Sequence, residues 1–231
     1  MQLEVIASSV EDAITAERGG ATRIELCVAL DQDGLTPPLP LMEAVVSAVR
    51  IPVRVMLRRR NDFAIQGESD LQALCDTATA IQHAGAAGLV LGFLEEQGVN
   101  DIALSRILAA APRMKTTFHR AFDALADEAQ QDATIAALKR FPQVDCILTA
   151  GGAGNWRQRA ERLTQLQQAA APEMEILVGG GVNAEAIAWL CQHTPLHAFH
   201  AGRAAREGSA VNDRVLEAKV RALRDAMQPH L

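Results

Sequence analysis

Three side chains that could do chemistry lie close together in the segment Thr116–Asp123, whose sequence is TTFHRAFD. His119, Arg120 and Asp123 supply an imidazole, a guanidinium and a carboxylate at the end of an apolar run that is typical of a buried strand. Thr117 and His119 share one face of that strand, so we predict that His119 points inward and acts as an acid or base. Arg120 and Asp123 are predicted to bind substrate, with Asp123 also orienting His119 or capping the next helix.

A second group follows from the alternation of residues along two other predicted strands. On Arg23–Cys27 the aliphatic residues suit a face covered by helices, which leaves Glu25 and Cys27 pointing inward. The same alternation along residues 53–57 and beyond places Arg58 inward, next to the second strand. We therefore expect a carboxylate, a thiol and a guanidinium at neighbouring strand ends.

These inward charges have two interpretations. In one, Glu25 and Arg58 act on a ligand, as a partner carboxylate and an anion holder. In the other, they belong to a buried ion cluster, because a carboxylate stays charged in a core only when it is paired. The pairs would then join Arg54 or Arg58 to Glu4 or Glu25.

Two glycine-containing segments predict an anion site. Gly180 and Gly181 follow the seventh predicted strand, and His200 and Arg203 lie at the end of the eighth. Glycine lets the backbone approach a ligand, and backbone N–H groups at a helix N-terminus attract anions. We therefore predict that these four residues bind substrate. The alternative is that the glycines only make tight turns between strand and helix.

The elements that carry these residues alternate between short apolar strands and longer helical segments. The predicted strands are 2–6, 23–27, 53–57, 88–91, 115–118, 146–148, 175–178 and 198–200, and the predicted helices are 9–19, 40–49, 69–84, 101–110, 128–140, 156–170, 183–192 and 213–227. Eight such units without a linker predict a single (β/α)8 TIM barrel domain over residues 1–231. A doubly wound open sheet is the alternative, but it leaves the last units unexplained.

Composition and charge exclude several classes of function. The chain has 231 residues and a formal net charge of -6, which disfavours a general nucleic-acid binder. The sequence does not open on a basic segment followed by an apolar run, and its longest apolar stretch, 84–94, is too short to span a bilayer. We therefore expect a cytoplasmic protein that binds neither nucleic acid nor membrane. This fold often dimerises, so a homo-oligomer is among the expected assemblies.

The spacing of the four cysteines predicts neither a disulfide framework nor a zinc ribbon. Cys75, Cys146 and Cys191 fall on apolar faces of predicted helices or in a predicted strand, where plain core packing is expected. Cys27, His119 and His200 lie at strand ends as candidate thiolate and imidazole ligands, which suit copper or zinc. Since no two of these residues are near in sequence, such a site would form only in the folded barrel.

Several segments, in this order along the chain, resemble the CutC family. They are 23–27 (RIELC) with 34–37 (GLTP), 56–58 (MLR) with 62–63 (DF), 117–123 (TFHRAFD), 147–152 (ILTAGG) and 179–182 (GGGV). The resemblance implies a cytoplasmic (β/α)8 barrel associated with copper homeostasis, with copper as a bound ion and cysteine as a ligand type. Cys27 stands at the family's cysteine after Glu-Leu, which makes it the expected copper ligand.

Two departures from the family pattern bear on the ligand. The family usually has Arg-Pro-Arg with glycine where this chain has residues 58–61 (RRRN), which predicts a third loop of different shape. The family's eighth strand usually ends in histidine followed by small residues, whereas here Arg203 closely follows His200. An added arginine favours an anion over Cu(I), because like charges repel.

Two functions therefore compete. One is a CutC-type barrel that binds copper through Cys27 and acts in copper homeostasis. The other is an enzyme for a small anionic, phosphorylated substrate, with His119 as acid or base and with Arg58, Arg120 and Arg203 holding the anion. A third alternative is a binding or assembly module, which predicts a large apolar surface patch and no convergent polar site.

Overall fold

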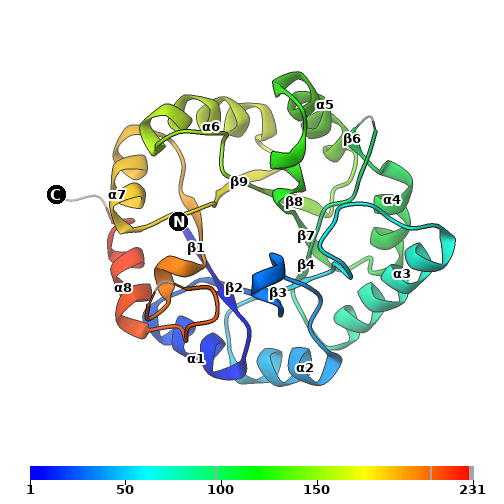
Figure 1. The fold of residues 1–231 in the computed structure, drawn as a ribbon, viewed down its shortest axis with the longest axis horizontal. Helices are drawn as coiled ribbons and strands as arrows, with labels where there is room; N and C mark the ends of the chain where they lie inside the picture. Colours follow the sequence, from blue (N-terminus) through cyan, green and yellow to red (C-terminus); the bar gives the residue numbers. More distant parts are fainter. Residues whose placement is uncertain (97, 209, 229–231) are drawn as a thin grey trace.

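The computed structural model describes residues 1–96, 98–208 and 210–228, and it contains a closed barrel of eight parallel strands (Figure 1). Around the barrel the strands follow the order β1, β10, β9, β8, β7, β4, β3, β2. The barrel strands are β1 (Gln2–Ala7), β2 (Arg23–Leu26), β3 (Val53–Met56), β4 (Gly88–Leu91), β7 (Lys115–Phe118), β8 (Val144–Thr149), β9 (Glu175–Val178) and β10 (Ala198–Ala201). The predicted (β/α)8 barrel is confirmed.

The α-helices of the described residues form the outer ring that Figure 1 shows around the strands. They are α1 (Val10–Gly19), α2 (Leu39–Ala48), α3 (Glu68–His83), α4 (Asp101–Ala110), α5 (Glu128–Leu138), α6 (Trp156–Ala170), α7 (Ala184–His193) and α8 (Glu217–Asp225). Five begin at a polar side chain that accepts a hydrogen bond from the backbone N–H three residues later, namely Ser9, Asn100, Asp127, Asn155 and Asn183. Within the described part of the chain, no helix is long and apolar enough to cross a membrane.

The loops differ from the prediction in two respects. Short elements follow several strands: the hairpin β5 (Leu94–Glu95) and β6 (Gly98–Val99), and the 3-10 turns η1 (Leu30–Gln32), η2 (Arg120–Ala124) and η3 (Arg203–Ala205). The last helix, expected over 213–227, begins only at Glu217. Arg206 and Val215 form an antiparallel bridge, and the Asp213 carboxylate accepts the Ala210 N–H, so these residues stay in a loop.

Charged groups lie inside the barrel beneath the strand ends, where an apolar filling is usual. Arg23 of β2 donates to the Glu4 carboxylate of β1 and lies 3.6 Å from Cys146 Sγ. Arg54 of β3 donates to the Asp145 carboxylate of β8 at 2.8 Å. Because Arg23 and Arg54 each have a carboxylate partner, the interior tolerates these two charges.

The expected ion pair between Arg54 or Arg58 and Glu4 or Glu25 does not form. Strand register explains the outcome for Glu4, which lies opposite Arg23 in the parallel pair of β1 and β2. Arg23 is therefore near enough to donate to Glu4, whereas the Arg54 guanidinium extends toward β7 and β8. Glu25 does lie opposite Arg54 in the pair of β2 and β3, but Arg54 donates to the Thr117 hydroxyl and to Asp145. A buried ion cluster is therefore present, but with different partners.

A second buried ion pair joins the first and last units of the barrel. Arg206, only 1% exposed, donates to Asp12 Oδ2 at 3.2 Å and to the carbonyl oxygens of Ile6 and Asp213. Asp12 also accepts the Val215 N–H at 3.0 Å. This network connects β1, α1 and the loop after β10, and it fixes that wall of the barrel mouth.

We predict that Arg206→Met lowers the free energy of unfolding by about 3–5 kcal/mol, because the buried Asp12 carboxylate loses its cation. Urea unfolding followed by circular dichroism measures the change. The control is Arg214→Met, which removes an exposed guanidinium paired with Glu207 and should leave the unfolding midpoint unchanged. Equal midpoints for Arg206→Met and the unmodified chain would show that the buried pair contributes nothing.

Candidate functional site

A cavity of about 950 Å³ opens at the carboxyl ends of the barrel strands, the end that carries active sites in this fold. It brings together all ten site residues that the sequence predicted, from β2, β3, β7, β9 and β10 and the loops after them. These are Glu25, Cys27, Arg58, His119, Arg120, Asp123, Gly180, Gly181, His200 and Arg203. Their location in one cavity is a finding, whereas their roles stay predictions.

His119 is buried at the end of β7 and presents one ring nitrogen to the cavity. Its Nδ1 accepts the Ala121 N–H at 3.2 Å, and its ring packs edge-on against Phe63, 5.4 Å between centroids. A Cβ on Gly92 would lie 2.5 Å from Nδ1, so only glycine there leaves room for this ring position. Burial, together with the Arg58 charge, lowers the pKa of His119 to about 3.

A neutral imidazole that accepts at Nδ1 carries its proton on Nε2. Nε2 of His119 has no hydrogen-bond partner among the residues that the structure describes, and the side chain lines the cavity. The geometry therefore favours a role for His119 as a neutral hydrogen-bond donor, and not as the acid or base expected from the sequence.

Asp123 does neither of the two things expected of it. Its carboxylate accepts from Arg120 Nε at 2.7 Å, from the Thr149 hydroxyl and from the Ala150 N–H. Helix α5 is capped by Asp127, and no bond joins Asp123 to His119. The reason is that η2 turns the chain after β7, so that Asp123 faces the end of β8. Asp123 thus fixes Arg120 at the rim and ties two strand ends together.

Three arginines that line the cavity have no carboxylate partner in the described part of the chain. Arg58, 5% exposed, donates to the Asn61 side chain at 2.6 Å and to two backbone carbonyls, and it lies 4.9 Å above the Phe63 ring. Burial lowers the pKa of Arg58 from its ordinary value. Arg159 has a buried Nε without a partner, and Arg203 stands exposed on η3.

Sequence reasoning missed Arg159 and Arg206, which also line the cavity. Arg159 lies one turn into α6 and reaches the carbonyl of Gly180 at 3.5 Å, a long contact. Arg206 comes three residues after Arg203 in the same loop. A search of the first helical turn and of the whole loop after each strand would have found both, whereas a search of the strand ends alone did not.

The glycines after β9 shape one wall of the cavity. Gly180 and Gly181 have φ values of 79° and 95°, a conformation that favours glycine. A Cβ on Gly180 would lie 2.8 Å from the Cβ of Ala150, whereas one on Gly181 would meet open space. Helix α7 begins just beyond them at the Asn183 cap, so its N-terminal end lies on the cavity wall.

Cys27 is a buried thiol on the cavity wall that packs against Met56 and Val90. Burial raises the pKa of Cys27 well above its ordinary value, and the nearby Glu25 adds to the effect, so the sulfur is held as a thiol. The position that a Cβ of Gly34 would occupy lies 3.2 Å from Cys27 Sγ and 3.5 Å from Met56 Cε. The sulfur of Cys27 and the terminal methyl carbon of Met56 therefore both lie near Gly34.

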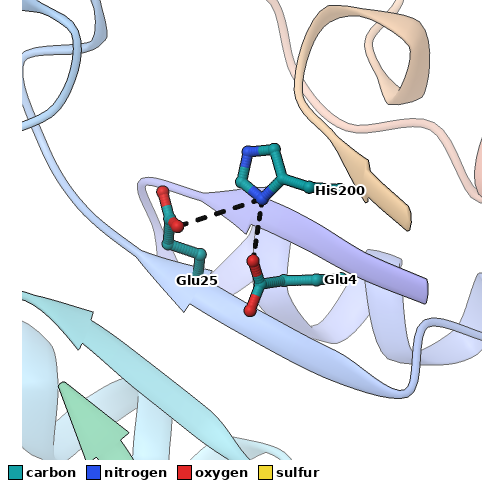
Figure 2. Close-up of side chains that lie close together, drawn as sticks. All are labelled: Glu4, Glu25 and His200. Carbon is teal, nitrogen blue, oxygen red and sulfur yellow. Dashed lines mark hydrogen bonds and ion pairs between the residues drawn. The ribbon is translucent and has the colours of Figure 1, made fainter. Parts of the chain in front are cut away.

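Glu4, Glu25 and His200 form a buried cluster (Figure 2), in which Glu25 and His200 also line the cavity. His200 Nδ1 lies 2.7 Å from Glu4 Oε1 and 3.9 Å from Glu25 Oε2. Burial alone would raise the pKa of Glu4, but Arg23 and His200 outweigh it and hold that pKa at about 2. Burial raises the pKa of Glu25 to about 7, against the attraction of His200. For His200, the two carboxylates overcome burial and raise its pKa.

The sequence of this chain is similar to those of known proteins from one family. The sequence model of the CutC family matches residues 1–205. A CutC family protein of Xylella fastidiosa is 35% identical over 200 residues, which cover 86% of this chain and 73% of that protein. A relative in Xanthomonas axonopodis pv. citri is 35% identical over 204 residues, or 87% of this chain and 82% of the relative.

A solved structure agrees with the sequence relatives. The crystal structure of a Streptococcus agalactiae protein, provisionally named the copper homeostasis protein CutC, has a TM-score of 0.78 and 26% sequence identity with this chain. The superposition covers 87% of this chain and 97% of that one. With a family match that extends from β1 through η3, this chain belongs to the CutC family.

Proposed function

We propose that this protein binds a small anionic ligand, of the kind represented by phosphate esters, in the mouth of its barrel and acts on it there. The observation that carries the proposal is the set of three cavity arginines without a carboxylate partner, Arg58, Arg159 and Arg203. The other two arginines of the cavity wall are already paired, Arg120 with Asp123 and Arg206 with Asp12. An unpaired guanidinium on a concave wall is ready to meet an anion bidentately.

The charge of the whole chain supports the same ligand class. The formal net charge is -6, so a cavity wall rich in arginine stands out against an acidic surface. A concave positive region with low-dielectric walls concentrates anions and raises their rate of association. Binding of a phosphorylated compound therefore needs no general basic surface.

His119 and the glycine wall supply neutral donors to the same ligand. The Nε2–H of His119 is positioned by Ala121 and Gly92. Because the pKa of His119 is about 3, the ring takes up no second proton in the ordinary pH range and stays neutral, with its single proton on Nε2. Gly180 and Gly181 leave the backbone before α7 open to a ligand oxygen. Fixed donors of this kind stabilise negative charge that develops on oxygen during a reaction. We therefore propose an enzyme whose reaction builds charge on a ligand oxygen.

We predict that Arg58→Gln and Arg203→Gln each weaken the binding of inorganic pyrophosphate about tenfold to a hundredfold, because one charge-assisted hydrogen bond contributes about 1.5–3 kcal/mol. Isothermal titration calorimetry with inorganic phosphate and pyrophosphate measures the affinity. The control is Arg214→Gln, an exposed arginine outside the cavity that pairs with Glu207. Equal losses in all three variants would indicate unspecific charge attraction and would contradict the site.

Copper is the second candidate, and one observation favours it. We propose that Cu(I) binds between the Cys27 thiol and the Met56 thioether, because the two side chains pack together and place Cys27 Sγ and Met56 Cε near Gly34. Sulfur ligands select Cu(I) over harder ions, and the relative of known structure is named for copper homeostasis. The raised pKa of Cys27 means that copper must displace a proton from sulfur. A cytoplasmic location is part of this proposal, as is a homo-oligomeric state.

We predict that Cys27→Ser abolishes stoichiometric Cu(I) binding, because the only thiolate at this position is lost. Competition with a coloured Cu(I) chelator under anaerobic, reducing conditions measures the stoichiometry. Cys75→Ser is the matched control, since Cys75 is a buried cysteine of α3 outside the cavity. A Cys27→Ser protein that retains one equivalent of Cu(I) would rule out this copper site.

A further inference from the structure

We propose that Glu4, Glu25 and His200 hold a divalent transition-metal ion of the Zn²⁺ or Mn²⁺ class at the floor of the cavity. Each residue offers one ligand atom, and the three ligand atoms lie within 4.8 Å of one another. In Figure 2 both carboxylates approach the same ring nitrogen of His200, while its second nitrogen points away from them. One ion in the space between them would contact all three atoms after small movements of the side chains.

The backbone places these ligands without help from any loop. They come from three strands that are adjacent in the barrel, β10, β1 and β2. Glu4 pairs directly with His200 in the register of β1 and β10, and Glu25 pairs with Ile6 two residues farther along β1. Sites built on strands hold their ligands more closely than sites built on loops. The cluster is therefore preorganised.

An independent observation points to a missing cation. Glu25 Oε2 is buried and has no hydrogen-bond partner among the described residues, although Glu25 lines the cavity and is only 2% exposed. A buried carboxylate oxygen without a donor costs free energy, and a cation bound to it removes that cost. The oxygen without a donor is the same atom that lies 3.9 Å from His200 Nδ1.

The groups around the cluster resemble the outer shell of a metal site. Arg23 donates to the oxygen of Glu4 that does not face His200, which fixes the orientation of this carboxylate. Arg23 also contacts Cys146 Sγ at 3.6 Å, so its own position is held. A bound ion would displace any proton from the ligating nitrogen of His200, which would leave this imidazole neutral. The two carboxylates and the Arg23 guanidinium then carry one net negative charge, which attracts a cation.

The ligand atoms decide the class of ion. Two carboxylate oxygens and one imidazole nitrogen suit Zn²⁺, Mn²⁺ and Fe²⁺, whereas Cu(I) prefers sulfur. Cys27 is not a member of the cluster, although it lines the same cavity. The proposed site is therefore distinct from the sulfur pair of Cys27 and Met56. With only three protein ligands, the ion keeps open positions toward the cavity, where it could take a ligand oxygen.

The test is metal titration of the full chain after treatment with a chelator, in the absence of any anionic ligand. Zn²⁺ binding by calorimetry and the visible absorption of Co²⁺ report the affinity and the kind of ligand atoms. We expect one equivalent to bind, and we expect Glu25→Gln to weaken binding by at least about 100-fold, since even a residue behind a ligand contributes about 10–100-fold. His200→Gln provides a second variant with the same expected loss.

Two controls separate this site from other metal-binding groups. Cys75→Ser, at a buried cysteine of α3 outside the cavity, should leave Zn²⁺ affinity unchanged. So should His197→Gln, which removes a surface histidine that pairs with Glu175 at 2.9 Å. Circular dichroism of each variant verifies its fold. Absence of stoichiometric binding, or equal affinity in Glu25→Gln and the unmodified chain, overturns the proposal. Because no anion is present, neither outcome depends on the proposed anionic ligand.

Discussion

Glu4 is the charge on which the interior of this barrel depends, because a fully buried carboxylate must be paired. Arg23 takes one of its oxygens and His200 the other, so a single side chain joins β2 and β10 to β1. With Glu4 satisfied in this way, the neighbouring Glu25 keeps an oxygen without a donor. Arg23 and His200 thus satisfy both oxygens of Glu4, and Glu25 keeps one buried carboxylate oxygen without a donor.

The cavity combines groups of opposite character at different depths. Carboxylates lie at the floor, arginines such as Arg58 and Arg203 lie on the walls and rim, and a pair of sulfur atoms lies beside η1. The proposed anionic ligand would lie between the proposed cation at the cluster of Glu4, Glu25 and His200 and the guanidinium groups of the wall, since attraction would act from both sides. The sulfur pair follows other rules, because soft ligands select soft ions. The proposed copper site and the proposed anion site therefore involve different residues of one cavity: Cys27 and Met56 for copper, and the arginines of the wall for the anion.

Much of the fold and the membership of the site could be predicted from the sequence, because both depend on local periodicity. The period of two along a strand is enough to point Glu25, Cys27 and His119 inward, and the barrel topology then gathers them at one end. Partners are a different matter. That Arg23 and not Arg54 pairs with Glu4 depends on strand register and side-chain reach, which no local pattern contains.

Closure of the barrel brings together residues from opposite ends of the chain, with 196 positions between Glu4 and His200. During synthesis Glu4 and Glu25 are made before β10, the strand whose His200 completes their cluster. Until then β1 is an open sheet edge, and contacts between distant residues form slowly. A chain that lacks β10 therefore carries an unpaired strand edge on β1. The cluster of Glu4, Glu25 and His200 is therefore complete only when β10 pairs with β1 and closes the barrel.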